Sequence, residues 1–110
     1  MAEKLLLQAQ KNEITEYYLY RALAQQEKNT ANKKTLLKLA NDELRHYQLL
    51  VKQTKKECKP NYAKVLWYRI LASLFGITFA IRLMEQGESH AQQFYAKQTG
   101  LVLKKLLREE

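Results

Sequence analysis

Glycine and proline are scarce in this chain: its 110 residues contain three Gly and a single Pro. Both residues disfavour the interior of a helix, so their scarcity leaves few places where a helix must end. Ala, Leu, Lys, Gln and Glu are common instead, and each tolerates a helical backbone at little cost. With 46% hydrophobic residues the chain can also bury a core. The composition predicts one compact all-α domain over residues 1–110.

Apolar and aromatic residues recur at intervals of three and four in the first half of the chain, as in amphipathic helices. This spacing predicts helices over about residues 4–26 and 33–55, forming an antiparallel hairpin. Between them, Asn29, Thr30 or Asn32 can cap the second helix by accepting its free backbone N–H groups. The buried stripe expected on the second helix consists of Leu36, Leu37, Leu39, Ala40, Leu44, Tyr47 and Leu50.

The longest apolar region of the chain, residues 65–84, follows the only proline, Pro60, which opens a connection between helices. Arg69 and Arg82 limit its uninterrupted apolar run to residues 70–81. That run is shorter than the roughly 20 residues that a helix needs to cross a bilayer. The sequence therefore predicts a buried core helix here rather than a membrane span.

The third helix is expected to continue to about residue 97, with Gly76 and Gly87 as tolerated points of close packing. Residues 101–110 then predict the first turns of a short or truncated fourth helix. Three long helices leave the apolar stripe of the third without a full set of neighbours, so we expect a homodimer. The side chains expected to be buried by self-association are Leu66, Ile70, Leu74, Phe75 and Phe79.

The chain carries a formal charge of +8, from 19 Lys and Arg against 11 Asp and Glu. Such a balance attracts nucleic acid or an anionic membrane surface. The Lys residues are scattered, however, without the interleaved aromatic residues that stack on bases, so no nucleic-acid partner is expected. The single Cys58 cannot form an intrachain disulfide, which fits a cytoplasmic location.

Acidic residues interrupt this basic chain at two similar places, both on expected helices. Residues three or seven positions apart share one face of a helix. Glu13 and Glu16 therefore point the same way as Tyr20, and Glu88 points the same way as Tyr95. The similarity suggests two related helical hairpins. The first place contains Glu13, Glu16 and Tyr20, and the second contains Glu85, Glu88 and Tyr95.

Glu43 and His46 add a third element, because a carboxylate and an imidazole at positions i and i+3 meet side by side on a helix. Carboxylate-rich helical sites with an imidazole suit iron or manganese. Di-iron helical bundles place one Glu on each of two helices and a Glu-x-x-His on each of the other two. Three of these four contributions can be read here: Glu13, the Glu43–His46 pair and Glu88. The alternative is that these acids are solvated or paired with Lys.

Two parts of the chain resemble a known family. Residues Asn12–Ala24 and Leu39–His46 resemble the first half of a rubrerythrin-type ferritin-like domain. Residues Gly76–Ala80, Leu83–Glu88 and the pair Phe94-Tyr95 are similar to the third helix of the rubrerythrin-like domains fused to vacuolar-iron-transporter-like membrane proteins. The resemblance covers nearly the whole chain and implies a ferritin-like helical bundle.

The same resemblance implies the residues of a di-iron site. The second Glu-x-x-His of the family does not follow Glu109 and Glu110, so another subunit or a longer chain would have to supply it. The implied metal ligands are Glu13, Glu43, His46 and Glu88, with Glu16 and Glu85 as alternative ligands and with Tyr20 and Tyr95 as hydrogen-bond donors to the carboxylates.

These implications give two hypotheses for function. In the first, the chain is an iron-binding ferritin-like domain that oxidises or handles Fe(II) with dioxygen or peroxide, as a ferroxidase or a peroxidase-type oxidoreductase. A longer form would then continue into a C-terminal membrane transporter domain and associate with the membrane through it. In the second hypothesis, the chain is a non-catalytic basic helical module that binds a membrane surface or nucleic acid.

Overall fold

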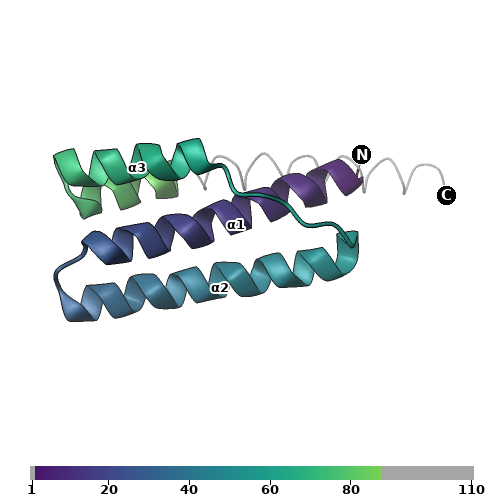
Figure 1. Ribbon diagram of the computed structural model, residues 1–110, viewed down its shortest axis with the longest axis horizontal. Helices are drawn as coiled ribbons and strands as arrows, with labels where there is room; N and C mark the ends of the chain where they lie inside the picture. Colours follow the sequence, from purple (N-terminus) through teal and green to yellow (C-terminus); the bar gives the residue numbers. More distant parts are fainter. Residues whose placement is uncertain (1, 88–110) are drawn as a thin grey trace. The chain divides into compact units, whose positions relative to one another are not determined.

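The computed structural model describes residues 2–87, which contain helices and their connections but no β-strand (Figure 1). The prediction of an all-α chain is confirmed. Two compact units divide the chain, Met1–Ala80 and Ile81–Glu110. The expected fourth helix lies outside the described residues. The helices are α1 (Ala2–Gln26), α2 (Thr30–Thr54) and α3 (Tyr62–Phe75), followed by a helical stretch over residues 77–87.

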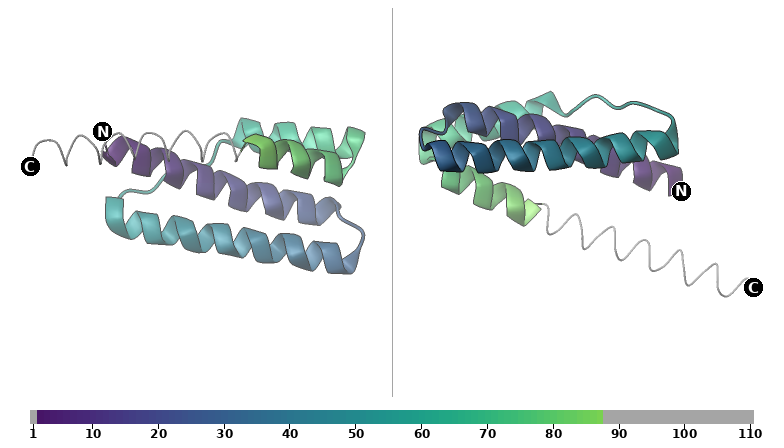
Figure 2. Two further views of the ribbon diagram at one scale, coloured as in Figure 1. Left: turned by 180° about the vertical axis from the view of Figure 1, so that it is seen from behind. Right: turned by 90° about the horizontal axis from the view of Figure 1, so that it is seen from below.

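Helix α1 is the central element of the first unit: it packs against both α2 and α3, whereas α2 and α3 do not contact each other (Figure 1). Figure 2 shows the same order from behind. The helices α1 and α2 are antiparallel, as predicted. Because α1 has a neighbour on two sides, it supplies half of the buried apolar side chains of the unit. Its buried apolar side chains are Ile14, Leu19, Tyr20, Ala22, Leu23 and Ala24.

The helix boundaries follow from local hydrogen bonds. Asn29 caps α2, as predicted, because its side-chain oxygen accepts a hydrogen bond of 3.0 Å from the N–H of Asn32. At the other end, Lys55 adopts a left-handed conformation (φ 58°) that terminates the helix. Asn61, directly after Pro60, caps α3 in the same way as Asn29 caps α2.

The buried stripe of α2 is narrower than the sequence predicts. Leu36 and Ala40 are buried, but Leu37 and Leu39 are exposed. The reason is that α2 has one helical neighbour in its unit, α1, so only a single i, i+4 row of side chains is covered. The prediction of burial for Leu37 and Leu39 is therefore wrong.

The predicted third helix is not continuous. It stops at Phe75, and the chain becomes helical again at residue 77. Between the two lies Gly76 with φ 97° and ψ 156°, a conformation that is accessible essentially to Gly alone. A Cβ atom added at Gly76 would meet nothing within 4 Å, so this Gly serves a backbone break and not the predicted close packing.

Helix α3 is also less buried than predicted. Its buried side chains, Tyr68, Leu71 and Ala72, lie at i, i+3 and i+4 and form one stripe, which matches its one helical neighbour in the unit, α1. The apolar side chains on its remaining surface are exposed. None of the helices in residues 2–87 combines the length and the apolar character that a membrane crossing requires. The exposed apolar side chains are Tyr62, Leu66, Trp67, Ile70, Leu74 and Phe75.

Hydrogen bonds from α1 hold the connection between α2 and α3. The side chain of Gln10 is fully buried; its Nε2 donates to the carbonyl of Lys56 (2.5 Å) and its Oε1 accepts from the Thr54 hydroxyl (2.8 Å). Thr15 Oγ1 accepts from the N–H of Asn61 (2.9 Å). Because these contacts fix both ends of the connection, α3 starts beside the middle of α1 and runs parallel to it.

An exposed ion pair adds to this connection. Lys56 Nζ donates to a carboxylate oxygen of Glu3 at 2.6 Å. The hydrogen bond and the charge of Lys56 lower the pKa of Glu3, and the same contact with Glu3 raises the pKa of Lys56. Since both side chains are exposed, water and salt screen the attraction between them.

Replacing Gly76 by Ala should destabilise the chain by about 1–3 kcal/mol, because a side chain strains the backbone at φ 97° even where space is open. Urea unfolding followed by circular dichroism measures the change. Gly87→Ala is the matched control: Gly87 is helical and also has open space, so this change should be neutral or stabilise by up to about 1 kcal/mol. Equal stabilities of the two variants would contradict the assigned backbone break.

Replacing Gln10 by Ala should cost about 2 kcal/mol of unfolding free energy, because it removes two hydrogen bonds and leaves a cavity at a buried position. Gln8→Ala is the control, since Gln8 is exposed on the same helix and carries the same change in helix propensity. Chemical denaturation measures the free energy of unfolding of each variant. A Gln8→Ala variant as destabilised as Gln10→Ala would show that the contacts of Gln10 with the connection are unimportant.

Candidate metal-binding site

The antiparallel hairpin brings Glu13 of α1 next to Glu43 of α2. The connection between the helices is centred on Lys28, and the two acids lie equally far from it along the chain, since 28 − 13 and 43 − 28 both equal 15. In an antiparallel helical pair, positions equally distant from the turn lie opposite each other. His46 lies three residues after Glu43 and so shares its face of α2.

Glu13, Glu43 and His46 form a compact group. The imidazole Nδ1 of His46 lies 3.5 Å from Oε2 of Glu13 and 4.0 Å from Oε2 of Glu43. One ligand atom from each of the three residues lies within 4.8 Å of the other two. Within residues 2–87 this is the one group of three or more His, Cys, Asp or Glu side chains with such spacing.

These distances suit a shared metal ion. Protein nitrogen and oxygen ligands bind a first-row divalent ion at about 2.0–2.2 Å, so two ligands of one ion lie at most about 4.4 Å apart. Both distances from His46 Nδ1 fall within that limit. A sub-ångström shift of one carboxylate would bring the whole group within it, and a Glu side chain can make such a shift by rotation about its own bonds.

The burial of the group favours a cation. The side chains of Glu13 and Glu43 are only 25% and 17% exposed, whereas that of His46 is 54% exposed. Two neighbouring carboxylates in a partly dry environment repel each other, and a cation between them relieves that repulsion. The exposed edge of the imidazole leaves the group open to solvent on one side. An ion can therefore reach it without unfolding of the hairpin.

Asp42 and Arg45 are neighbours of the group in sequence but pair with each other. A carboxylate oxygen of Asp42 lies 2.5 Å from an Arg45 guanidinium nitrogen, and Arg45 is largely exposed. Asp42 and Arg45 have the same i, i+3 spacing as Glu43 and His46, one position earlier in α2. The guanidinium of Arg45 is thereby engaged by an acid outside the group.

The other residues predicted for the site are placed differently. Glu16 and Tyr20 lie one and two turns after Glu13 on α1; both are buried and both make interactions of their own. Glu16 is not part of the three-residue group. Glu85 lies in the second unit, Ile81–Glu110. Glu88 and Tyr95 lie outside the described residues.

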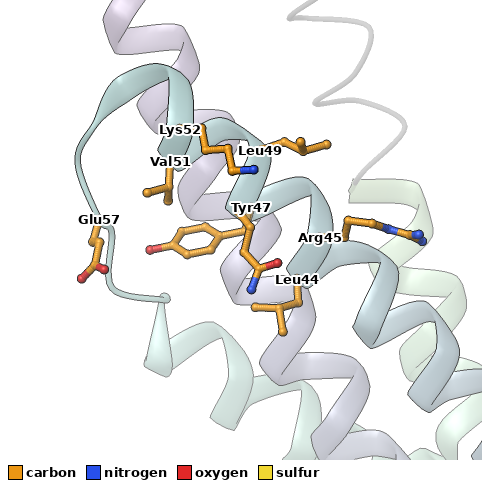
Figure 3. Close-up of a pocket in the computed structure, with 8 residues that line it drawn as sticks. Leu44, Arg45, Tyr47, Leu49, Val51, Lys52 and Glu57 are labelled. Atoms are coloured by element: carbon orange, nitrogen blue, oxygen red, sulfur yellow. The ribbon is translucent and has the colours of Figure 1, made fainter.

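An open groove lies elsewhere on α2. It has a volume of about 550 Å³, and the three residues of the metal group are not among those that line it. Figure 3 shows the Tyr47 side chain reaching from α2 toward the connection that carries Glu57. The Tyr47 hydroxyl accepts a hydrogen bond from the N–H of Cys58 at 3.0 Å, so Tyr47 supports the connection. The lining residues are Leu44, Arg45, Tyr47, Gln48, Leu49, Val51, Lys52 and Glu57.

Sequence reasoning did not identify the polar residues that hold the connection in place: Gln10, Thr15 and Tyr47. A signal was present for Gln10 and Thr15, because both are polar residues within the otherwise apolar stripe of a helix. Their partners are backbone groups far away in the sequence, however, and no local pattern reveals such partners.

No family model, no curated protein and no solved structure matches this chain.

The geometry predicts which nitrogen of His46 binds an ion. Nδ1 is the ring atom near both carboxylates, so Zn²⁺ should move the ¹⁵Nδ1 resonance further than the ¹⁵Nε2 resonance. Nuclear magnetic resonance of the ring nitrogens measures this with the diamagnetic ion. The only other histidine, His90, is assigned from a His90→Gln variant. A larger shift at Nε2 of His46 would contradict the arrangement.

Proposed function

We propose that this chain is a ferritin-like iron-binding domain whose first ion is held by Glu13, Glu43 and His46. The observation that carries the proposal is the proximity of three ligand atoms from two helices, all within 4.8 Å of one another. The Glu43–His46 spacing is that of the Glu-x-x-His element in di-iron helical bundles, and Glu13 corresponds to the single Glu of a neighbouring helix.

The donor set supports iron over softer metals. Two carboxylates and one imidazole provide hard and borderline ligands without a thiolate, which suits ferrous iron and also manganese. The single cysteine, Cys58, is not part of the group. A structural zinc site would instead close four ligands around the ion, usually with Cys among them. Three ligands leave coordination positions free for a second group of residues or for a substrate.

A di-iron site would need further carboxylates. We propose Glu88 as the second single Glu, with Glu16 and Glu85 as alternative ligands and Tyr20 and Tyr95 as hydrogen-bond donors to the carboxylates. The second Glu-x-x-His would come from a longer form of the chain or from another subunit. This part of the proposal rests on the sequence pattern and on the resemblance to rubrerythrin-type domains.

The proposed activity is oxidation or handling of Fe(II). Bound ferrous iron supplies one electron per ion to dioxygen or peroxide. The residues of the chain would hold the ions: Glu13 and Glu43 would offset their charge, and His46 would bind through the lone pair of its Nδ1. A free carboxylate oxygen of Glu43 can rotate toward a second ion, because only one oxygen per carboxylate is needed in the group.

The test is an anaerobic Fe(II) titration of the chain followed by exposure to oxygen, with the remaining ferrous iron measured by a chelator. We expect binding of at least one Fe(II) per chain and faster loss of ferrous iron than in buffer. Glu43→Gln and His46→Gln should each weaken binding by roughly tenfold or more. The control is Asp42→Asn, which removes a neighbouring carboxylate that pairs with Arg45 and lies outside the group.

The helical content of each variant is measured by circular dichroism before its titration is interpreted. The proposal fails if the chain takes up no Fe(II), or if Asp42→Asn weakens binding as much as Glu43→Gln. Binding without accelerated oxidation would support an iron-binding role and exclude the ferroxidase activity of the chain as tested.

A further inference from the structure

Helix α3 exposes an apolar face that its own unit leaves uncovered. Leu66, Ile70 and Leu74 follow one another at intervals of four and therefore form a row along the helix. They are 56%, 43% and 70% exposed. Trp67, which is 55% exposed, lies beside this row. Contiguous apolar surface of this kind marks a binding surface, because scattered single residues would not line up along one element.

The row also borders a hollow with a basic edge. A shallow hollow of about 320 Å³ is lined by Leu66, Ile70 and Leu74 together with Arg69. The Arg69 side chain therefore lies at the edge of the apolar surface. Gln26 and Ser73 complete the lining. An apolar hollow next to a guanidinium group matches a ligand with an anionic head and a hydrocarbon tail.

The charges in the sequence segment that contains α3 are of one sign. From residue 58 to residue 80 the sequence contains no Asp or Glu, but it contains Lys59, Lys64 and Arg69. In a homodimer that buried this face, the Arg69 side chains at its edge would come near each other and repel. An anionic surface would attract them instead. Charge complementarity thus favours an anionic partner over a second copy.

We propose that the exposed face of α3 docks on an anionic phospholipid surface, with Leu66, Ile70 and Leu74 at the acyl boundary and Arg69 at the headgroup phosphates. The helix has 14 residues, too few to cross a bilayer, so it lies in the plane of the interface. Trp and Tyr side chains prefer the level of the lipid headgroups. On α3 these are Trp67 and Tyr62, and Tyr62 is 63% exposed. This docking does not depend on the metal site.

Trp67 provides the readout, because it is the only Trp in the chain. The full chain is mixed with vesicles of phosphatidylglycerol and phosphatidylcholine, or with vesicles of phosphatidylcholine alone. We expect a blue shift of the Trp67 emission and co-sedimentation with the anionic vesicles only. Both should decrease strongly in 1 M salt, where the Debye length falls to about 3 Å.

Two matched variants locate the surface. Leu66→Glu places a charge in the proposed face and should reduce vesicle binding about tenfold, because the carboxylate opposes both apolar insertion and the anionic lipid. Leu49→Glu is the control, since Leu49 lies on α2 and is equally exposed, at 55% against 56% for Leu66. It should leave binding within about twofold of the unchanged chain. Circular dichroism is used to check that both variants are folded.

Other occupants give different results. If a second copy covers the face, Trp67 shifts with protein concentration in the absence of vesicles, the shift is lost in Leu66→Glu, and vesicles add nothing. If another segment of the chain covers it, acrylamide quenches Trp67 poorly at every protein concentration. Either result overturns the proposal, as does equal loss of vesicle binding in Leu49→Glu and Leu66→Glu.

Discussion

The burial of α1 between α2 and α3 is the constraint on which the first unit depends. A helix covered on two sides needs apolar side chains over a broad arc, and α1 supplies them with Leu19, Leu23 and Ala24, all fully buried. The same arrangement leaves each outer helix with a single covered stripe. The carboxylate group is one consequence, because it lies where α2 meets α1. The exposed face of α3 is another, because it lies on the side of α3 that α1 does not cover.

Local sequence signals predicted the helices well. The capping of α2 by Asn29 and the break around Pro60 depend on neighbouring residues, and such short-range interactions are visible in a single sequence. The break at Gly76 was missed, although Gly is the residue that a positive φ requires. An apolar run on both sides made a continuous helix the better interpretation. Only the φ value distinguishes a Gly that ends a helix from one that is tolerated within it.

For the candidate site, the pairing of Glu43 with His46 was predictable because an i, i+3 pair needs nothing beyond a helix. Placing Glu13 against them required the hairpin, and its equal distance from the turn makes that contact predictable too. The position at which α3 starts was not predictable in this way. It depends on the contacts of Thr15 and Gln10 with backbone groups of a distant connection, which fix where α3 begins.

The acidic residues of the first unit are segregated along the chain, whereas its basic residues are not. Its seven acids, from Glu3 to Glu57, all precede α3, whereas residues 58–80 carry only cations. A cation beside Glu13 and Glu43 would feel their carboxylates more strongly than the more distant Lys side chains, because salt at 0.15 M screens charges over about 8 Å. On the proposed docking face of α3, the same screening would limit the influence of the acids of the hairpin on Arg69.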